Sequence, residues 1–187
     1  MSVVLLTPKR FQDERGWFLE SYSARSYKER GIPAVFCQDN HSMSVPVGVL
    51  RGLHFQSPPH AQAKLVRCVR GSIWDVALDI RDGSPTYGHW VSAELNADNG
   101  KQLFVPTGFA HGFVTLEERT EVEYKTSDFY APSSEAGIIW NDPDLNLPWP
   151  LPPQGPILSP KDLLLPKLRD LKTPFAYDGT PLSLIEV

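Results

Sequence analysis

Short runs in which apolar and polar residues alternate follow one another along the first two thirds of the chain. Such alternation places successive side chains on opposite faces of a β-strand. Turn signals rich in glycine and proline, such as Arg81-Asp-Gly-Ser-Pro85 and Ala97-Asp-Asn-Gly100, separate the runs. The pattern predicts an all-β sandwich or barrel. We expect strands at residues 3–6, 16–21, 35–42, 48–56, 64–69, 73–80, 88–95, 102–105, 110–116 and 121–129.

The remaining segments carry weaker signals. A short helix is expected at residues 24–29, because Gly31 and Pro33 would stop it. After Ala131 the sequence becomes rich in proline, and one helical turn is expected at residues 159–165, with Ser159 as N-cap and Pro160 at the first position. Trp, Leu and Phe residues in this segment indicate that it packs on the barrel. We therefore expect one domain, residues 1–187, with a C-terminal segment (131–187) lying against the barrel.

Composition argues against several classes of function. The formal net charge of the 187-residue chain is −4, which does not favour a nucleic-acid or anionic-membrane partner. No apolar run approaches the roughly 20 residues that span a bilayer. The N-terminus lacks the basic start and long apolar core of a secretory signal, and Cys37 and Cys68 form no CxxC motif. The sequence predicts a cytoplasmic protein that binds neither nucleic acid nor membrane.

Two of the expected strands carry a histidine within an alternating stretch bounded by glycine or proline. They are Gly48-Val-Leu-Arg-Gly-Leu-His-Phe-Gln56 and Pro106-Thr-Gly-Phe-Ala-His-Gly-Phe113. Two such strands can line one barrel interior. The pattern therefore predicts a buried reactive pocket that holds His54 and His111.

The spacing of these motifs resembles the cupin superfamily of small jelly-roll barrels. The second cupin motif, G-x5-P-x-G-x2-H, matches Gly100, Pro106, Gly108 and His111. The first motif begins G-x5-H, which matches Gly48 and His54, and its final glycine matches Gly71. The resemblance implies an all-β fold, a cupin-type jelly-roll β-barrel with short peripheral helices.

Two metal-ligand positions of the superfamily are altered in this chain. Lys64 stands where metal cupins have an acidic ligand, and Gln56 stands where they have a second histidine. A lysine ammonium beside a divalent ion is disfavoured by Coulomb repulsion. We therefore expect no metal and no redox cofactor, and an ammonium group in place of the ion.

An ordered series of further motifs resembles the dTDP-4-dehydrorhamnose 3,5-epimerase family. One such motif would be weak evidence, but their order along the chain, from Phe11 to about Leu168, makes chance an unconvincing explanation. The motifs are Asp13-Glu-Arg-Gly-Trp-Phe-Leu-Glu20, Gln38-Asp-Asn-His-Ser42, Val49-Leu-Arg-Gly-Leu-His-Phe-Gln56, Lys64-Leu-Val-Arg-Cys-Val-Arg-Gly71, Ser84-Pro-Thr-Tyr-Gly88, Pro106-Thr-Gly-Phe-Ala-His-Gly-Phe113, Glu123-Tyr-Lys-Thr-Ser-Asp-Phe-Tyr130, Ile139-Trp-Asn-Asp-Pro143 and Leu158-Ser-Pro-Lys-Asp162.

The resemblance implies an isomerase that inverts C3 and C5 of dTDP-4-dehydro-6-deoxy-D-glucose and gives dTDP-4-dehydro-L-rhamnose through an enolate. His54 is then the base, because an imidazole with a pKa of about 6.5 is largely neutral at pH 7. Asp162 is implied to orient His54. Tyr124 is implied to act as the acid on the other side of the sugar, and Lys64 to stabilise the enolate at the C4 oxygen.

The same resemblance implies a set of substrate-binding residues. Arginine suits bidentate phosphate binding, which assigns Arg15 and Arg51 to the diphosphate. Phe18 and Tyr130 are assigned to the thymine ring, and His111 to the C4 oxygen or a ring hydroxyl. The polar contacts to substrate are assigned to Glu20, Gln38, Asn40 and Glu135.

Two of these placements depend on the fold. Arg51 lies three residues before His54, so regular strand pairing would put the two side chains on opposite faces. A bulge at Gly52 would turn both toward the site. The family forms homodimers with exchanged strands, which implies that residues such as Arg15 or Gln38 reach the partner's pocket.

Three other functions remain open from the sequence. A mono-epimerase that acts at C3 or C5 alone would share the catalytic residues. A metal-dependent cupin oxygenase or isomerase would need more histidines in the first motif than this chain has. A non-catalytic sugar-nucleotide-binding cupin would bind dTDP without exchanging protons of the ketosugar with solvent.

Overall fold

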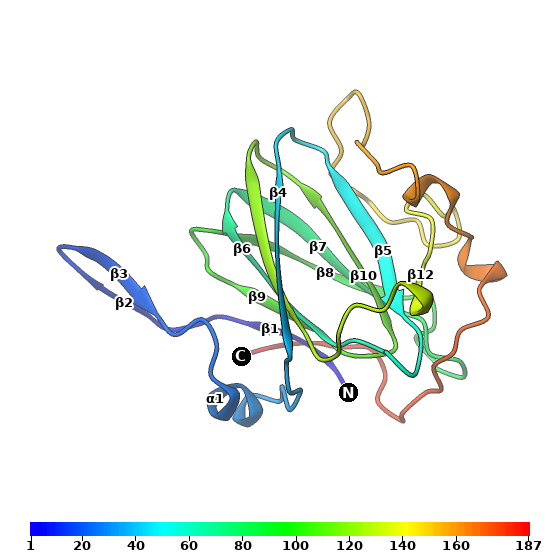
Figure 1. Ribbon diagram of the computed structural model, residues 1–187, viewed down its shortest axis with the longest axis horizontal. Coiled ribbons are helices and arrows are strands. Elements are labelled where there is room, and N and C mark those ends of the chain that lie inside the picture. The colour runs from blue at the N-terminus through cyan, green and yellow to red at the C-terminus, as the bar shows by residue number, and fades with distance from the viewer.

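The computed structural model describes residues 1–187, and its regular structure is mostly strands, which confirms the predicted all-β architecture (Figure 1). One sheet has six strands in the order β13-β1-β9-β6-β11-β4, and a second has five in the order β12-β5-β10-β7-β8. The strands of the six-stranded sheet are β13 (Leu184–Glu186), β1 (Val3–Leu6), β9 (Gln102–Val105), β6 (Lys64–Arg70), β11 (Thr120–Thr126) and β4 (Gln38–Ser44). The strands of the five-stranded sheet are β12 (Glu135–Gly137), β5 (Leu50–Gln56), β10 (Phe109–Thr115), β7 (Ser72–Asp79) and β8 (Trp90–Asn96).

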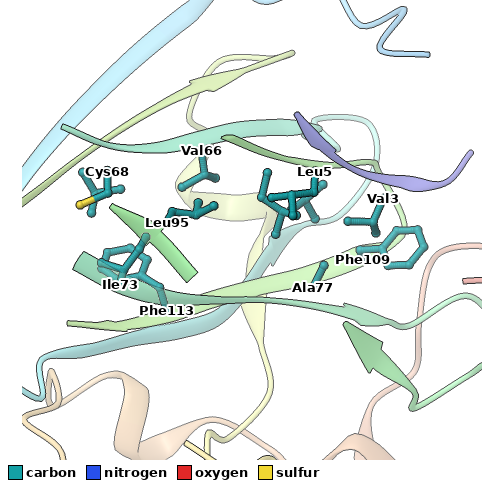
Figure 2. Packing of buried hydrophobic residues seen from close by; sticks show 12 residues of the cluster. Val3, Leu5, Val66, Cys68, Ile73, Ala77, Leu95, Phe109 and Phe113 are labelled. Carbon is teal, nitrogen blue, oxygen red and sulfur yellow. The ribbon is translucent and has the colours of Figure 1, made fainter. Parts of the chain in front are cut away.

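The two sheets face each other across an apolar core (Figure 2). Val66 of β6 and Leu5 of β1 come from the six-stranded sheet, and Ile73 of β7 and Phe113 of β10 come from the five-stranded sheet. These residues belong to one cluster of twelve buried side chains. The alternation seen in the sequence therefore directs one face of each strand into the space between the sheets.

The C-terminal segment covers the outer face of the five-stranded sheet. Leu78 of β7 and Val114 of β10 are fully buried there, in a second cluster that includes Trp149 and Leu168. Because both faces of β7 are covered, nearly all of its residues are buried. The polar strand face that a simple two-sheet sandwich would expose is thus absent from β7.

A short helix covers part of the outer face of the six-stranded sheet. Helix α1 spans Ala24–Glu29, as predicted, and the side chain of Ser23 caps it by accepting a hydrogen bond from the Ser26 amide. Tyr27 of α1 and Ile32 pack with Phe104 of β9 in a third buried cluster. No helix in the structure has the length and hydropathy needed to cross a membrane.

A two-stranded hairpin projects away from the barrel (Figure 1). It consists of β2 (Arg10–Asp13), which the sequence analysis missed, and β3 (Gly16–Leu19). Phe11, Trp17 and Phe18 of this hairpin are more than half exposed. A hairpin with such exposed aromatic residues and only four residues per strand has too little core of its own for independent stability.

The chain after β11 contains short elements that the sequence analysis placed only in part. The expected turn at residues 159–165 is a 3-10 helix, η2, at Asp162–Leu164, and Ser159 Oγ accepts a hydrogen bond from the Asp162 amide. Two further 3-10 helices are η1 (Pro132–Ser134) and η3 (Leu168–Asp170). Strand β13 was not expected, and it pairs in parallel with β1 at the edge of the larger sheet.

Candidate active site

A cavity of about 570 Å³ opens between the two sheets and is bordered by the C-terminal segment. His54 of β5 and His111 of β10 line the wall from the five-stranded sheet, and Tyr124 of β11 and Lys64 of β6 line the wall from the six-stranded sheet. Asp162 enters from the segment that follows β12. The structure therefore gathers in one cavity all four residues predicted to be catalytic.

A bulge in β5 turns both Arg51 and His54 into this cavity. His111 pairs with His54, but Phe113 pairs with Arg51, so Gly52 and Leu53 of β5 oppose the single residue Gly112 of β10. Gly52 lies inside the bulge with φ of +121°, and a Cβ there would lie 2.6 Å from Gly112 Cα. Only glycine fits this close backbone contact. The bulge considered from the sequence is present, and it resolves the alternation problem for Arg51.

His54 and Asp162 form a short hydrogen bond. The His54 Nε2–H donates to Asp162 Oδ1 at 2.6 Å, so the ring presents its Nδ1 atom away from the carboxylate. The His54 side chain is 25% exposed, whereas that of Asp162 is 4% exposed. Burial lowers the pKa of His54 below its ordinary value, although Asp162 acts in the opposite direction. The histidine is therefore favoured in its neutral form, the form that accepts a proton.

Lys64 carries a desolvated ammonium group inside the cavity. Its Nζ donates only to the carbonyl oxygen of His54, at 3.4 Å, and it makes no salt bridge. Burial lowers the pKa of Lys64 from 10.5 to about 8, and Asp75 and Glu135 oppose that shift. A cation that has lost part of its hydration interacts more strongly with a negative charge that forms nearby than a fully solvated one does.

Tyr124 stands on the wall that faces His54. Burial raises its pKa above the ordinary value of 10, and the nearby Arg51 guanidinium only partly offsets this effect. Burial thus outweighs the neighbouring cation in setting the pKa of Tyr124. The raised pKa keeps the phenol protonated at neutral pH, so that Tyr124 has a proton to give.

His111 has a carboxylate partner that the sequence analysis missed. Its Nε2–H donates to Asp75 Oδ1 at 2.6 Å, and the side chain of Asp75 is fully buried. Asp75 lies on β7 between Ile73 and Ala77, which belong to the apolar core. A signal for Asp75 was present in the sequence, because it is a charged residue at an inward position of an otherwise apolar strand.

Polar residues surround a second hollow of about 300 Å³ that shares His54, Lys64 and Tyr124 with the main cavity. Tyr130 Oη donates to Glu135 Oε2 at 2.9 Å, and Lys161 Nζ donates to Glu135 Oε1 at 2.5 Å. Lys161, which also lines the main cavity, was not singled out from the sequence, although it lies in a matched motif. The other predicted polar residues at this hollow are Gln38 and Asn40, whose side-chain amides are hydrogen-bonded to each other.

Gln56, which replaces a cupin metal ligand, has a structural role. Its Nε2 donates to the carbonyl oxygens of His60 and Phe129, and its Oε1 accepts from the amide of Ala131. These bonds join the loop after β5 to the loop after β11. The side-chain amide is thus already engaged, and no group of three His, Cys, Asp or Glu side chains is arranged to hold a metal ion.

Three predicted substrate-binding residues lie far from this cavity. Arg15 and Phe18 belong to the projecting hairpin, and Glu20 follows it (Figure 1). The Arg15 side chain is 85% exposed and pairs with Asp13 at 2.5 Å. Because the hairpin points away from the barrel, the structure does not bring these residues to the cavity of their own chain.

Comparison with known proteins agrees with this geometry. Residues 1–170 match the family model described as dTDP-4-dehydrorhamnose 3,5-epimerase. The chain is similar to the dTDP-4-dehydrorhamnose 3,5-epimerase of Shigella flexneri, with 51% identity over 162 residues, which is 86% of this chain and 88% of the relative. It is less similar to a dTDP-4-dehydrorhamnose 3-epimerase of Streptomyces niveus, with 40% identity over 88% of this chain and 80% of that relative.

A solved structure shares the fold over nearly the whole chain. It is the dTDP-6-deoxy-D-glucose-3,5-epimerase of Legionella pneumophila in complex with dTDP-4-keto-L-rhamnose. The TM-score is 0.88 and the identity 45%, over 92% of each chain. Its match confirms the predicted cupin-type barrel. With a family match over most of its length and relatives at about half identity, the chain belongs to the dTDP-4-dehydrorhamnose 3,5-epimerase family.

Proposed function

We infer that this chain inverts C3 and C5 of dTDP-4-dehydro-6-deoxy-D-glucose and gives dTDP-4-dehydro-L-rhamnose. One observation carries this function. The His54–Asp162 pair and the phenol of Tyr124 lie on opposite walls of one cavity, with the Lys64 ammonium in the same space. A base and an acid on opposite sides of a ring carbon are what stereochemical inversion requires.

In the proposed reaction, each inversion consists of two proton transfers, one to His54 and one from Tyr124. His54 Nδ1 takes the proton from the carbon beside the ketone, and the C–H electron pair moves to form an enolate at the C4 oxygen. Asp162 holds the Nε2–H of the imidazolium that results. Lys64 stabilises the enolate oxygen by its charge. Tyr124 then returns a proton to the opposite face of the carbon. Exchange with solvent removes the proton from His54 and restores that of Tyr124, and the same sequence at the second carbon completes the inversion.

The pKa shifts suit these roles near neutral pH. The lowered pKa of His54 leaves the base free of a proton, and the raised pKa of Tyr124 keeps the acid protonated. The pKa of Lys64, about 8, leaves most of the ammonium charged at pH 7. Each group is thus in the protonation state that its proposed step needs.

Cations and polar groups around the two hollows fit a nucleoside diphosphate. Arg51 and Lys161 line the main cavity and suit phosphate oxygens. Tyr130, which is more than half exposed, can stack on the base, and Gln38, Asn40 and Glu135 can bond the sugar and base. With its Nε2–H given to Asp75, His111 presents Nδ1 as an acceptor in the neutral ring, which suits a ring hydroxyl of the sugar.

We propose that Arg15, Phe18 and Glu20 act in the site of a partner subunit in a homodimer. The projecting hairpin and its exposed aromatic residues support this, since such a patch favours burial against another chain. The test mixes Arg15→Ala and His54→Ala subunits after reversible dissociation. If the arm acts in the partner's site, one site of each mixed dimer is intact, and random mixing restores about a quarter of wild-type activity. Inactivity of the mixed dimers would place Arg15 in its own chain's site, and fully active Arg15→Ala homodimers would place it outside any site.

The double epimerisation is tested by incubating the dTDP-4-ketosugar with the protein in heavy water. Deuterium at both C3 and C5, read by NMR, is the expected result. The relative from Streptomyces niveus is named a 3-epimerase. For this reason mono-epimerisation is the second candidate function. Deuterium at C3 or C5 alone would establish that function, and no deuterium at either carbon would leave a binding protein.

A further inference from the structure

One carboxylate lies inside the barrel at a position where the surrounding residues are apolar. Asp75 is fully buried, and the residues that share its face of β7, Ile73 and Ala77, belong to the core between the sheets (Figure 2). An ionised carboxylate loses its hydration when it is buried, so such a residue requires partners that compensate for this loss.

Asp75 has one partner among the protein groups, and half of its hydrogen-bonding capacity is unused. Oδ1 accepts from His111 Nε2–H at 2.6 Å. Oδ2 is buried and accepts no hydrogen bond from any protein group. His111 sits diagonally across the β7–β10 ladder, because Asp75 pairs with Phe113 and His111 pairs with Ala77. The strand register thus fixes the carboxylate behind the imidazole, on the side away from the cavity.

Lys64 carries a second charge in this region that has no salt-bridge partner. Its ammonium is desolvated, makes no salt bridge, and lines the same cavity as His111. Burial lowers the pKa of Lys64 to about 8, and among the charges that oppose this shift Asp75 acts most strongly, ahead of Glu135. The negative charge of Asp75 therefore favours the charged form of Lys64, although no hydrogen bond joins the two side chains.

We propose that Asp75 is a positioning residue of the epimerase reaction, whose buried carboxylate fixes the ring of His111 and keeps Lys64 charged beside the C4 oxygen of the substrate. This role rests on the proposed function of Lys64. Asp75 does not line the cavity and exchanges no proton with the substrate. It acts through the two side chains that do line it.

Other charged or titratable groups also face the space around Lys64. They influence its pKa too, so the test must leave them unchanged. They are Arg51 and His54 on β5, His111 on β10, Tyr124 on β11, Tyr130 after β11, Glu135 on β12, and Lys161 and Asp162 at η2. Asp75→Asn leaves all of these in place. It removes the charge and keeps an oxygen that accepts from His111.

The first experiment reads the titration of Lys64 itself, without substrate. Trace labelling with acetic anhydride across pH, followed by peptide mass spectrometry, gives the fraction of Lys64 that is unprotonated. We expect a midpoint near pH 8 in the wild-type protein and a midpoint lower by about one unit in Asp75→Asn. An unchanged midpoint in the folded variant overturns the proposal. Because no substrate is used, failure of the proposed epimerase function leaves this result interpretable.

The second experiment is the pH profile of kcat/KM. Loss of the Asp75 charge should move the alkaline limb to lower pH, because Lys64 loses its proton earlier, and Asp75→Glu should restore most of the wild-type profile. Asp39→Asn is the matched control: Asp39 pairs at the surface with Lys125, at 2.8 Å, and its loss should leave the profile unchanged. An Asp75→Asn profile that keeps the wild-type alkaline limb contradicts the role.

If Asp75→Asn does not fold, the same coupling is measured from the other side. Charge–charge interactions are mutual, so Lys64→Met should raise the pH at which the Asp75 carboxyl carbon titrates in ¹³C NMR. An Asp75 titration that is the same in Lys64→Met and wild-type protein overturns the proposal.

Discussion

The cavity holds two histidine–carboxylate pairs that share one geometry and differ in their surroundings. In each pair the Nε2–H donates to a carboxylate oxygen at 2.6 Å. His54 is 25% exposed and its partner comes from the C-terminal segment, whereas His111 is 8% exposed and its partner lies on the neighbouring strand. The hydrogen bond alone therefore does not determine what a histidine does. Access to the cavity and the neighbouring charges favour proton transfer at His54 and a fixed ring at His111.

The largest expected effect separates the two histidines. His54→Ala should lower proton exchange at both sugar carbons by about 10²–10⁴-fold, because it removes the base. Binding of dTDP should remain close to that of the wild type. His111→Ala should lower the rate less, since the base is retained. The measurement is deuterium incorporation by NMR, with His41→Ala as a control on the outer face of β4. Exchange that survives in His54→Ala would remove His54 as the base.

Tyr124→Phe tests whether the acid is distinct from the base on the other wall. Abstraction by His54 should continue, so deuterium should still enter the substrate, while formation of the inverted sugar should fall by about 10²-fold or more. Exchange and product are measured in the same sample. Complete loss of exchange would mean that Tyr124 acts before or during proton abstraction.

Lys64→Met tests the charge that shares the cavity with the two pairs. The variant should lose activity yet be more stable at pH 7, on the order of 1–3 kcal/mol, because a desolvated ammonium disfavours folding. The pKa of Lys64 is about 8 in the folded chain and 10.5 without burial. The folded chain binds fewer protons between these values, so wild-type stability gains from rising pH in that window. Urea unfolding at pH 7 and 9.5 should show the advantage of the variant shrinking. A variant less stable than wild type at pH 7 contradicts this account.

The smallest expected effect on the fold comes from a residue near neither pair. Phe18 is 68% exposed on the hairpin, so Phe18→Ala should change the free energy of unfolding of the isolated chain by no more than about 0.5 kcal/mol. If the hairpin completes a partner's site, KM for the dTDP-sugar should still rise. Thermal unfolding and steady-state kinetics check both parts, and an unchanged KM would remove Phe18 from the site.

Local sequence signals were sufficient for most of the barrel and insufficient for segments whose structure depends on distant partners. β1, β9 and α1 have the expected bounds, because short apolar runs, turn residues and the helix-stopping Gly31 and Pro33 are encoded within a few residues. β13 was missed because its three residues form a strand only by pairing with β1 at the other end of the chain.

The same distinction applies to the site. The family motifs placed His54, Lys64, Tyr124 and Asp162 in one cavity, whereas Asp75 was missed because it lies outside the quoted motifs. The position of Arg51 required the bulge at Gly52, which depends on contact with Gly112 across the ladder. No pattern in the sequence predicted that Lys161 would bond Glu135.

The delivery of Asp162 by the segment after β12 has a consequence for biosynthesis. When a growing polypeptide has released its strands through β12 from the ribosome, it already contains both imidazoles, the phenol and the ammonium, but only His111 has its acidic partner. Asp162 emerges after these groups. In the proposed mechanism, proton abstraction by His54 therefore waits for the segment that also covers the five-stranded sheet.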